Sequence, residues 1–187
     1  SIAQAMAASQ GKVVVVGGHN LLRRSGRGSE LTFTEGGPTR SESVRCGLAH
    51  VPLSAEIVVV HDAARPLADE DIFDRVIEAV RSGADAAIPA IPVVDTIQST
   101  GGEFIDREGL RVVQTPQAFS APALRAAHSS GLNATDDATL VAAAGGQVVS
   151  VNGDFRNLKI THPIDIQVAK AFLAWPEISY PQGIYES

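Results

Sequence analysis

Two short apolar runs constrain the fold of this chain more than any other feature. Val13–Val16 and Ile57–Val60 each consist only of Val and Ile, so neither run contains a polar residue. Uninterrupted runs of β-branched residues are typical of strands covered on both faces by helices, as in parallel sheets. Weaker apolar runs occur at 86–89 and 147–151. The sequence therefore predicts at least four strands of a mostly parallel sheet.

Helical patterns alternate with these runs, and the segment Glu70–Arg81 carries the clearest one. Its apolar residues at positions 72, 73, 76, 77 and 80 form one stripe on a helix. Asp69 precedes them as an expected N-cap. Further helices are predicted at 41–49, 121–128, 136–143 and 164–173. The alternation of strands and helices predicts an α/β fold with a doubly wound sheet.

The segment 95–114 breaks this rhythm. Polar and apolar residues alternate from 95 to 100, Gly101 and Gly102 indicate a turn, and the chain can return at 110–114. We interpret it as an antiparallel excursion that forms an arm. The rest of 1–174 is expected to be one domain that begins with a helix at 2–9, and 175–187 is expected to be a loosely held tail.

Composition excludes several classes of function. The net charge of −6 disfavours a nucleic-acid partner, and the single cysteine, Cys46, cannot form a disulfide framework. No apolar run approaches the roughly 20 residues of a membrane span. The first residues lack the basic start of a signal peptide. We therefore expect a cytoplasmic protein that does not contact a membrane.

Polar residues that follow an apolar run are candidates for ligand binding, because ligands of open α/β sheets bind beyond the carboxyl ends of the strands. Asp62 and Arg65 follow the run that ends at Val60, separated by small residues. Asp62 can hold a metal or accept hydrogen bonds from substrate hydroxyls, and Arg65 can grip a phosphate. Alternatively, Asp62 caps a turn and Arg65 only pairs with it. Gly36 and Gly37 precede a helix start that can bind an anion, or they form an ordinary turn.

Three other positions leave two readings open. Thr135, Asp136 and Asp137 open a helix, where the carboxylates can cap it or approach a ligand. Lys159 lies in an apolar segment, where it either neutralises an anion or is simply solvated. Histidines such as His128 have no metal-ligand spacing and no evident acid partner, so we interpret them as structural.

Six motifs occur in a specific order along the chain. They are Gly36-Gly37-x-x-Arg40-x-x-Ser43-Val44, the run 58–66, Asp95-Thr96, Gln114-Thr115-Pro116-Gln117-x-Phe119, Thr135-Asp136-Asp137, and Asn157-x-Lys159-Ile160-Thr161-x-Pro163-x-Asp165. In this order and spacing, the chain resembles the 2-C-methyl-D-erythritol 4-phosphate cytidylyltransferase family from about residue 13 to residue 172. The resemblance implies a Rossmann-like, glycosyltransferase-A-like nucleotidyltransferase fold.

The resemblance implies the reaction of CTP with methylerythritol phosphate, with Mg²⁺, to give CDP-methylerythritol and pyrophosphate. Asp62 and Lys159 would be catalytic, while no residue is assigned to the metal. A homodimer formed through the arm is also implied, with Thr96 and Arg107 reaching the partner's substrate. Other substrate contacts would come from Arg65, Thr115 and Thr135, and nucleotide contacts from Gly36, Gly37, Ser43 and Ala63.

Two departures from the family pattern stand out. No segment matches the family's Gly-rich N-terminal loop, whose Arg and Lys grip the triphosphate, so we expect the natural chain to begin upstream of Ser1. Gln98 stands where the family often has Lys. The alternatives are a ribitol-5-phosphate cytidylyltransferase and a catalytically inactive nucleotide-binding or scaffold module.

Overall fold

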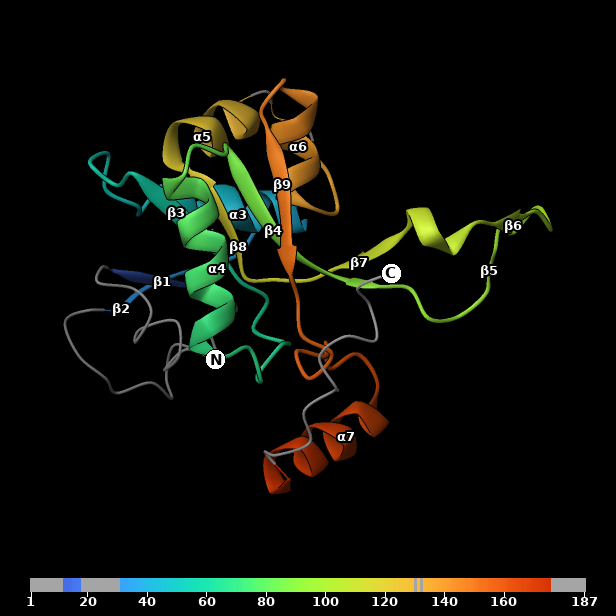
Figure 1. Ribbon diagram of the computed structural model, residues 1–187. Helices are drawn as coiled ribbons and strands as arrows, with labels where there is room; N and C mark the ends of the chain where they lie inside the picture. The colour runs from blue at the N-terminus through green and yellow to red at the C-terminus, as the bar shows by residue number, and fades with distance from the viewer. Residues whose placement is uncertain (1–11, 18–30, 130, 132, 176–187) are drawn as a thin grey trace.

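The computed structural model describes residues 12–17, 31–129, 131 and 133–175 of the chain. The helix expected at 2–9 and the tail from 176 onward lie outside these residues. The described part combines a central sheet with helices on both of its faces and an arm that projects from the body (Figure 1). None of its helices is long and apolar enough to span a bilayer. The α/β class predicted from the sequence is confirmed.

The central sheet has five strands: β3 pairs with β8, β8 and β7 pair with successive parts of one edge of β4, and β9 pairs with the opposite edge of β4. Its strands are β3 (Ile57–Val60), β4 (Ala86–Pro92), β7 (Arg111–Val113), β8 (Gln117–Ser120) and β9 (Val148–Asn152). Only β4 and β9 pair in parallel, while the three other pairings are antiparallel. The expectation of a mostly parallel sheet is therefore wrong, because β8 inserts between β3 and β4 and runs against both.

A second, small sheet holds the first apolar run. β1 (Val13–Val16) pairs in parallel with β2 (Leu31–Thr34), from Val13 with Leu31 to Val16 with Thr34. The sequence predicted β1 but not β2, because β2 is not a continuous apolar run: Thr32 and Thr34 interrupt it. Among the described residues, neither strand is hydrogen-bonded to the central sheet.

Helices cover both faces of the central sheet. The helix α4 (Glu70–Arg81) packs on one face, where Val76 and Val80 meet Ala87 and Ala118. The predicted bounds of α4 and its Asp69 N-cap, which accepts from the Ile72 amide, are confirmed. On the other face lie α3 (Arg40–Leu48), α5 (Ala121–Ser129) and α6 (Asp137–Ala143).

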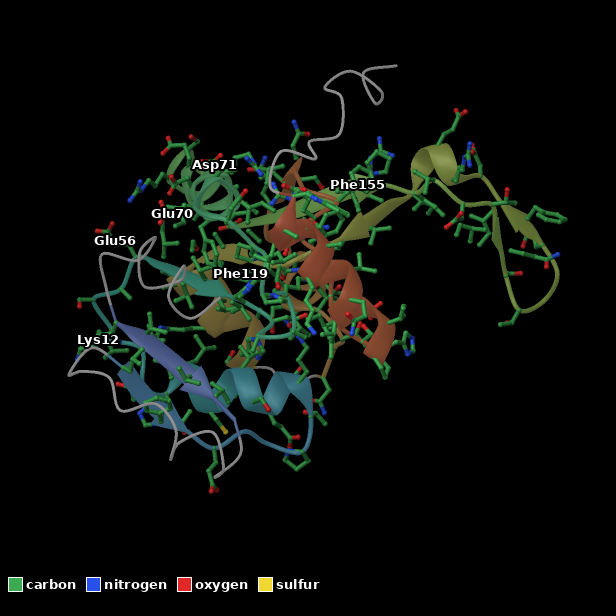
Figure 2. The ribbon with its side chains drawn as sticks, turned by 90° about the horizontal axis from the view of Figure 1, so that it is seen from below. Lys12, Glu56, Glu70, Asp71, Phe119 and Phe155 are labelled. Carbon is green, nitrogen blue, oxygen red and sulfur yellow. The ribbon has the colours of Figure 1, made fainter. Side chains whose placement is uncertain are left out.

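Phe119 of β8 is the centre of the larger core cluster. It is fully buried and packs with Leu48, Leu124 and Leu140 from the three helices of that face. Figure 2 places Phe119 in the interior, whereas Glu70 and Asp71 lie at the outer surface at the start of α4. The burial of such a ring is the largest apolar contribution of one side chain to this core.

The arm contains the antiparallel pair β5 (Ile97–Gln98) and β6 (Phe104–Ile105), followed by the short 3-10 helix η1 (Arg107–Gly109). The antiparallel excursion is confirmed. Its return strand β7 pairs with β4 of the central sheet rather than with the outgoing strand. The last helix, α7 (Pro163–Ala174), lies below the sheet in Figure 1 and begins with Pro at its first turn.

Candidate active site

The loop that follows β3 is held in place by Thr115. The Thr115 hydroxyl accepts from the Asp62 amide at 3.0 Å and lies 3.2 Å from His61 Nδ1. His61 Nε2 lies 3.1 Å from the carbonyl oxygen of Arg65, so Nε2 carries the proton and Nδ1 accepts from Thr115. Burial lowers the pKa of His61, against the opposing effect of the Arg65 carbonyl. A neutral ring and a hydroxyl thus fix the backbone that presents Asp62.

The Asp62 carboxylate lies between two cations. Its Oδ2 is 3.0 Å from Lys159 Nζ, and its Oδ1 is 3.9 Å from Arg40 Nε. The Asp62 side chain retains 21% exposure, enough to meet a ligand. Arg40, Asp62 and Lys159 therefore come together from three segments that are far apart in the sequence. They meet beyond the end of β3, where the sequence analysis expected a ligand site.

Arg65 is buried and spans the floor of this site. Its Nη1 donates to the carbonyl of Asn157 at 2.8 Å, and Nη2 lies 3.4 Å from the carbonyl of Val113. Burial lowers the pKa of Arg65, while the charge of Asp62 acts in the opposite direction. The Arg65 Nε is buried and has no partner among the described residues. The guanidinium is thus committed mainly to holding the loop after β9 against the loop after β3.

The segment that carries Lys159 is anchored on both sides. The Asn157 side chain donates to the carbonyl of Thr115 at 2.9 Å, and the Ile160 amide donates to the carbonyl of Ala64 at 2.8 Å. Gln114 adds a hydrogen bond to the carbonyl of Asp154. The backbone around Lys159 is therefore fixed, whereas its side chain is 51% exposed and can turn.

The predicted glycine turn leads into α3. The Gly37 amide donates to Ser43 Oγ at 3.1 Å, which closes the turn over the helix start. A Cβ at Gly37 would lie 2.3 Å from Glu42 Cβ, so no larger residue fits there. Thr39 caps the helix in a capping box with Glu42. The structure brings Gly36, Gly37 and Ser43 together, as the sequence predicted.

Arg40 is tied to a buried acid that the sequence reasoning left open. Asp137 is fully buried and accepts from Arg40 Nη1 at 2.6 Å and from His128 Nε2 at 2.9 Å. Burial favours the neutral acid, but the hydrogen bonds from His128 and Arg40 and their charge outweigh it and lower the pKa of Asp137. The expectation that His128 has no acid partner is therefore wrong. The sequence did not reveal this contact, because the two residues are nine positions apart and a loop separates their helices.

The other predicted site residues lie on the arm or on exposed loops. Thr96 and Arg107 are exposed on the arm, which projects from the body of the molecule (Figure 1). Arg107 donates to the carbonyl of Val94 within the arm itself. Ala63 and Thr135 are exposed near the site, with no hydrogen bond of the Thr135 hydroxyl among those described. The arm residues and the Asp62 site are therefore separate in the monomer.

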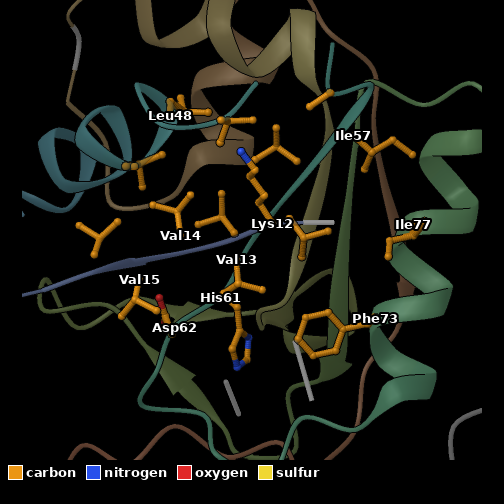
Figure 3. Close-up of a pocket in the computed structure, with 18 of the residues that line it drawn as sticks. Lys12, Val13, Val14, Val15, Leu48, Ile57, His61, Asp62, Phe73 and Ile77 are labelled. Carbon is orange, nitrogen blue, oxygen red and sulfur yellow. The ribbon is translucent and has the colours of Figure 1, made fainter. Parts of the chain in front are cut away.

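A cavity of about 1000 Å³ opens beside Asp62. Figure 3 shows it between β1 and β3, with His61 and Asp62 at one end and Phe73 and Ile77 of α4 along its wall. Arg40, Ser43 and Ala63 join the polar end, while the strand valines and the polar side chains of Lys12, Ser54, Asp74 and Arg81 line the remainder. The candidate site residues therefore gather at one end of the cavity.

A metal site built by the protein alone is not found in the described part of the chain. No group of three His, Cys, Asp or Glu side chains comes together there. Asp62 is the carboxylate best placed to reach an ion next to a bound ligand. One carboxylate with ligand phosphates and water is a common arrangement for Mg²⁺.

Comparison with known proteins identifies the family of this arrangement. The family model described as IspD: 2-C-methyl-D-erythritol 4-phosphate cytidylyltransferase matches residues 3–175. The enzyme of that name from Streptomyces avermitilis is 42% identical over 158 residues, which are 78% of this chain and 63% of the relative. That from Nocardia farcinica is 45% identical over 143 residues, covering 74% of this chain and 62% of the relative.

A solved structure has the same fold. The crystal structure of 2-C-methyl-D-erythritol 4-phosphate cytidylyltransferase from Thermus thermophilus superposes with a TM-score of 0.81 at 38% identity. The match covers 92% of this chain and 88% of that one. Against the two curated relatives, by contrast, the chain spans less than two thirds of their length.

Proposed function

Because this chain belongs to the 2-C-methyl-D-erythritol 4-phosphate cytidylyltransferase family, we propose that it transfers the cytidylyl group of CTP to methylerythritol phosphate in isoprenoid biosynthesis. The observation that carries the proposal is the Asp62 carboxylate, presented at the end of β3 between Lys159 and Arg40. Such a carboxylate can accept from substrate hydroxyls while nearby cations attract phosphates.

The reaction depends on the positions of the two substrates and of nearby charges rather than on a covalent intermediate with the enzyme. A phosphate oxygen of methylerythritol phosphate attacks the α-phosphorus of CTP, the bond to the β-phosphate oxygen breaks, and pyrophosphate leaves. Asp62 would orient the polyol through its hydroxyls. Lys159, with a half-exposed side chain on a fixed backbone, would neutralise charge on the phosphoryl oxygens. Arg65, Thr115 and Thr135 are proposed to line the polyol side.

The nucleotide is proposed to bind at the polar end of the cavity. There Gly36, Gly37 and Ser43 form the tight turn before α3, and Ala63 is small enough for a base or ribose to approach the backbone. Mg²⁺ would come with the triphosphate and lie near Asp62, where it would lower the charge of the phosphates. The described residues supply a single carboxylate for it, which fits that arrangement.

A homodimer through the arm is proposed on the exposure of its apolar residues. Phe104 is 71% exposed, and Ile105, Val112 and Val113 are exposed as well. On α7, Ile164 and Leu173 are also uncovered. Apolar surface of this extent on two projecting elements favours contact with a second subunit. Thr96 and Arg107 would then meet the partner's substrate.

Sedimentation and one substitution test the dimer. Arg107→Ala is expected to raise the KM for methylerythritol phosphate in a protein that sediments as a dimer. A chain that remains monomeric at assay concentrations removes the basis for this role. The location is proposed to be the cytoplasm, where CTP is made, with no nucleic acid or membrane as partner.

Pyrophosphate release tests the reaction itself. The purified protein is given CTP and Mg²⁺ with methylerythritol phosphate or, in parallel, with ribitol 5-phosphate. Faster release with methylerythritol phosphate supports the proposal, and the names of the relatives favour this substrate. Equal or faster release with ribitol phosphate supports the ribitol enzyme. No release with either supports an inactive binding module.

A further inference from the structure

Asp62 has one movable partner and one fixed partner. Lys159 contacts it at 3.0 Å through a half-exposed side chain with a long flexible stem. Arg40 lies further away, at 3.9 Å, but is held from behind by Asp137 at 2.6 Å. Since Asp137 is fully buried and also bound to the buried His128, Arg40 cannot swing out with a ligand.

The two cations cannot serve the same purpose during the reaction. If Lys159 turns toward a phosphoryl oxygen, the Asp62 carboxylate loses its closest positive partner. A carboxylate with 21% exposure, left alone next to incoming phosphates, would repel them and would pull Lys159 back. Arg40 is the cation that remains beside Asp62, because its anchor is independent of any ligand.

We propose that Arg40 is a positioning residue that takes over the Asp62 carboxylate when Lys159 moves to the phosphate. Asp137 and His128 hold Arg40 in place for this exchange of partners. The proposal rests on the proposed function, since it assigns Lys159 to a phosphoryl oxygen. Arg40 itself touches no reacting atom in this scheme, and its effect passes through Asp62 to Lys159.

A double-mutant cycle separates this role from a structural one. Turnover is measured for wild type, Arg40→Ala, Lys159→Ala and the double variant. We expect Arg40→Ala to lower kcat by about tenfold or more, with a smaller change in KM. In the Lys159→Ala background, the same change should cost less than about twofold, because no lysine remains to be released. An equal loss in both backgrounds overturns the proposal.

Two further variants guard against a trivial loss of folding. Arg40→Lys keeps a positive charge beside Asp137 but cannot reach both carboxylates, so it should preserve the fold and leave kcat as low as in Arg40→Ala. Arg45→Ala, on the same helix, removes a hydrogen bond to Asn133 and is expected to leave kcat unchanged. If Arg45→Ala lowers kcat as much as Arg40→Ala, the effect belongs to α3 as a whole and the proposal fails.

Binding of inorganic pyrophosphate distinguishes this inference from the reaction. By calorimetry, Lys159→Ala should bind pyrophosphate more weakly than wild type. Arg40→Ala should weaken binding in the wild-type background and have little effect in the Lys159→Ala background. This pattern supports the exchange even if no substrate is turned over, in which case only the proposed reaction fails. Pyrophosphate binding that is equally weakened in both backgrounds indicates a general loss of charge and overturns the exchange.

Discussion

Along one edge, β3 pairs with β8 from Ile57 to Val60, whereas its other edge faces the cavity and β1. On the paired edge, Phe119 and Ala118 are fully buried, and Thr115 and Asn157 fix the loops of the site. On the cavity edge, the residues of β3 itself are only half-buried, although all four are Val or Ile. The paired edge thus carries the stability of the site, and the cavity edge provides its access.

Asp137→Ala should have the largest effect on the free energy of unfolding, because Asp137 is fully buried. Arg40 and His128 would lose their shared acid in a fully buried place, and we expect a loss of about 3–5 kcal/mol in the free energy of unfolding. Urea unfolding measures it. Asp69→Ala, which removes the exposed N-cap of α4, should cost about 1 kcal/mol. Similar losses in the two variants would show that the buried pair is not special.

A matched pair of truncations tests the two edges directly. Phe119→Ala should reduce the free energy of unfolding by about 3–5 kcal/mol, as expected for a fully buried ring. Val15→Ala, on the wall of the cavity, should cost about 1 kcal/mol or less, because that side chain already borders open space. Thermal and urea unfolding give both values. A loss at Val15 that matches the loss at Phe119 contradicts the comparison.

Asp62→Asn should leave stability intact and remove function. The carboxylate is partly exposed at the cavity end, so its charge contributes little to folding. We expect turnover to fall by more than about tenfold, since the amide cannot attract two cations. The control is Asp69→Asn, because Asn caps a helix as well as Asp does. Near-normal rates in Asp62→Asn refute the role of this residue.

The smallest expected effect is a dependence of stability on pH, which arises from the buried Asp137 carboxylate. The pKa of Asp137 is lowered in the folded protein, so its contribution to stability is present above the unfolded pKa, about 4. This contribution is lost as the pH falls through the lower, folded pKa. Wild type should therefore progressively lose its advantage over Asp137→Asn as the pH falls below about 4. A difference in unfolding free energy that does not change over this range is the contrary result.

The sequence predicted the elements of the paired edge better than their pairing. Ile57–Val60 and α4 carry patterns that depend only on what covers their faces, and both were correct. The direction of the neighbouring strand is not encoded in those patterns, because helices cover an antiparallel pair equally well. β8 was missed because its four residues Gln117–Ser120 follow a Thr-Pro turn and carry no clear alternation.

The site was predictable where its residues are close in sequence. Asp62 and the glycine turn could be found because polar residues follow an apolar run, or precede a helix. The bond between Arg40 and Asp137 joins positions 97 residues apart, and His128 reaches its acid across the loop between α5 and α6. Such contacts depend on how helices pack, which no local pattern specifies.

Among the described residues, one edge of β1 and one edge of β3 have no strand partner, and this has a consequence for the production of the protein. Backbone groups along these two edges pair with no other described strand. Such groups are templates for strand addition between molecules. We expect concentrated samples to form thioflavin-positive aggregates. The substitution Val15→Lys should delay them, as charged gatekeepers do on natural sheet edges. The solubility of the purified chain thus reports on whether this part of the sheet is covered.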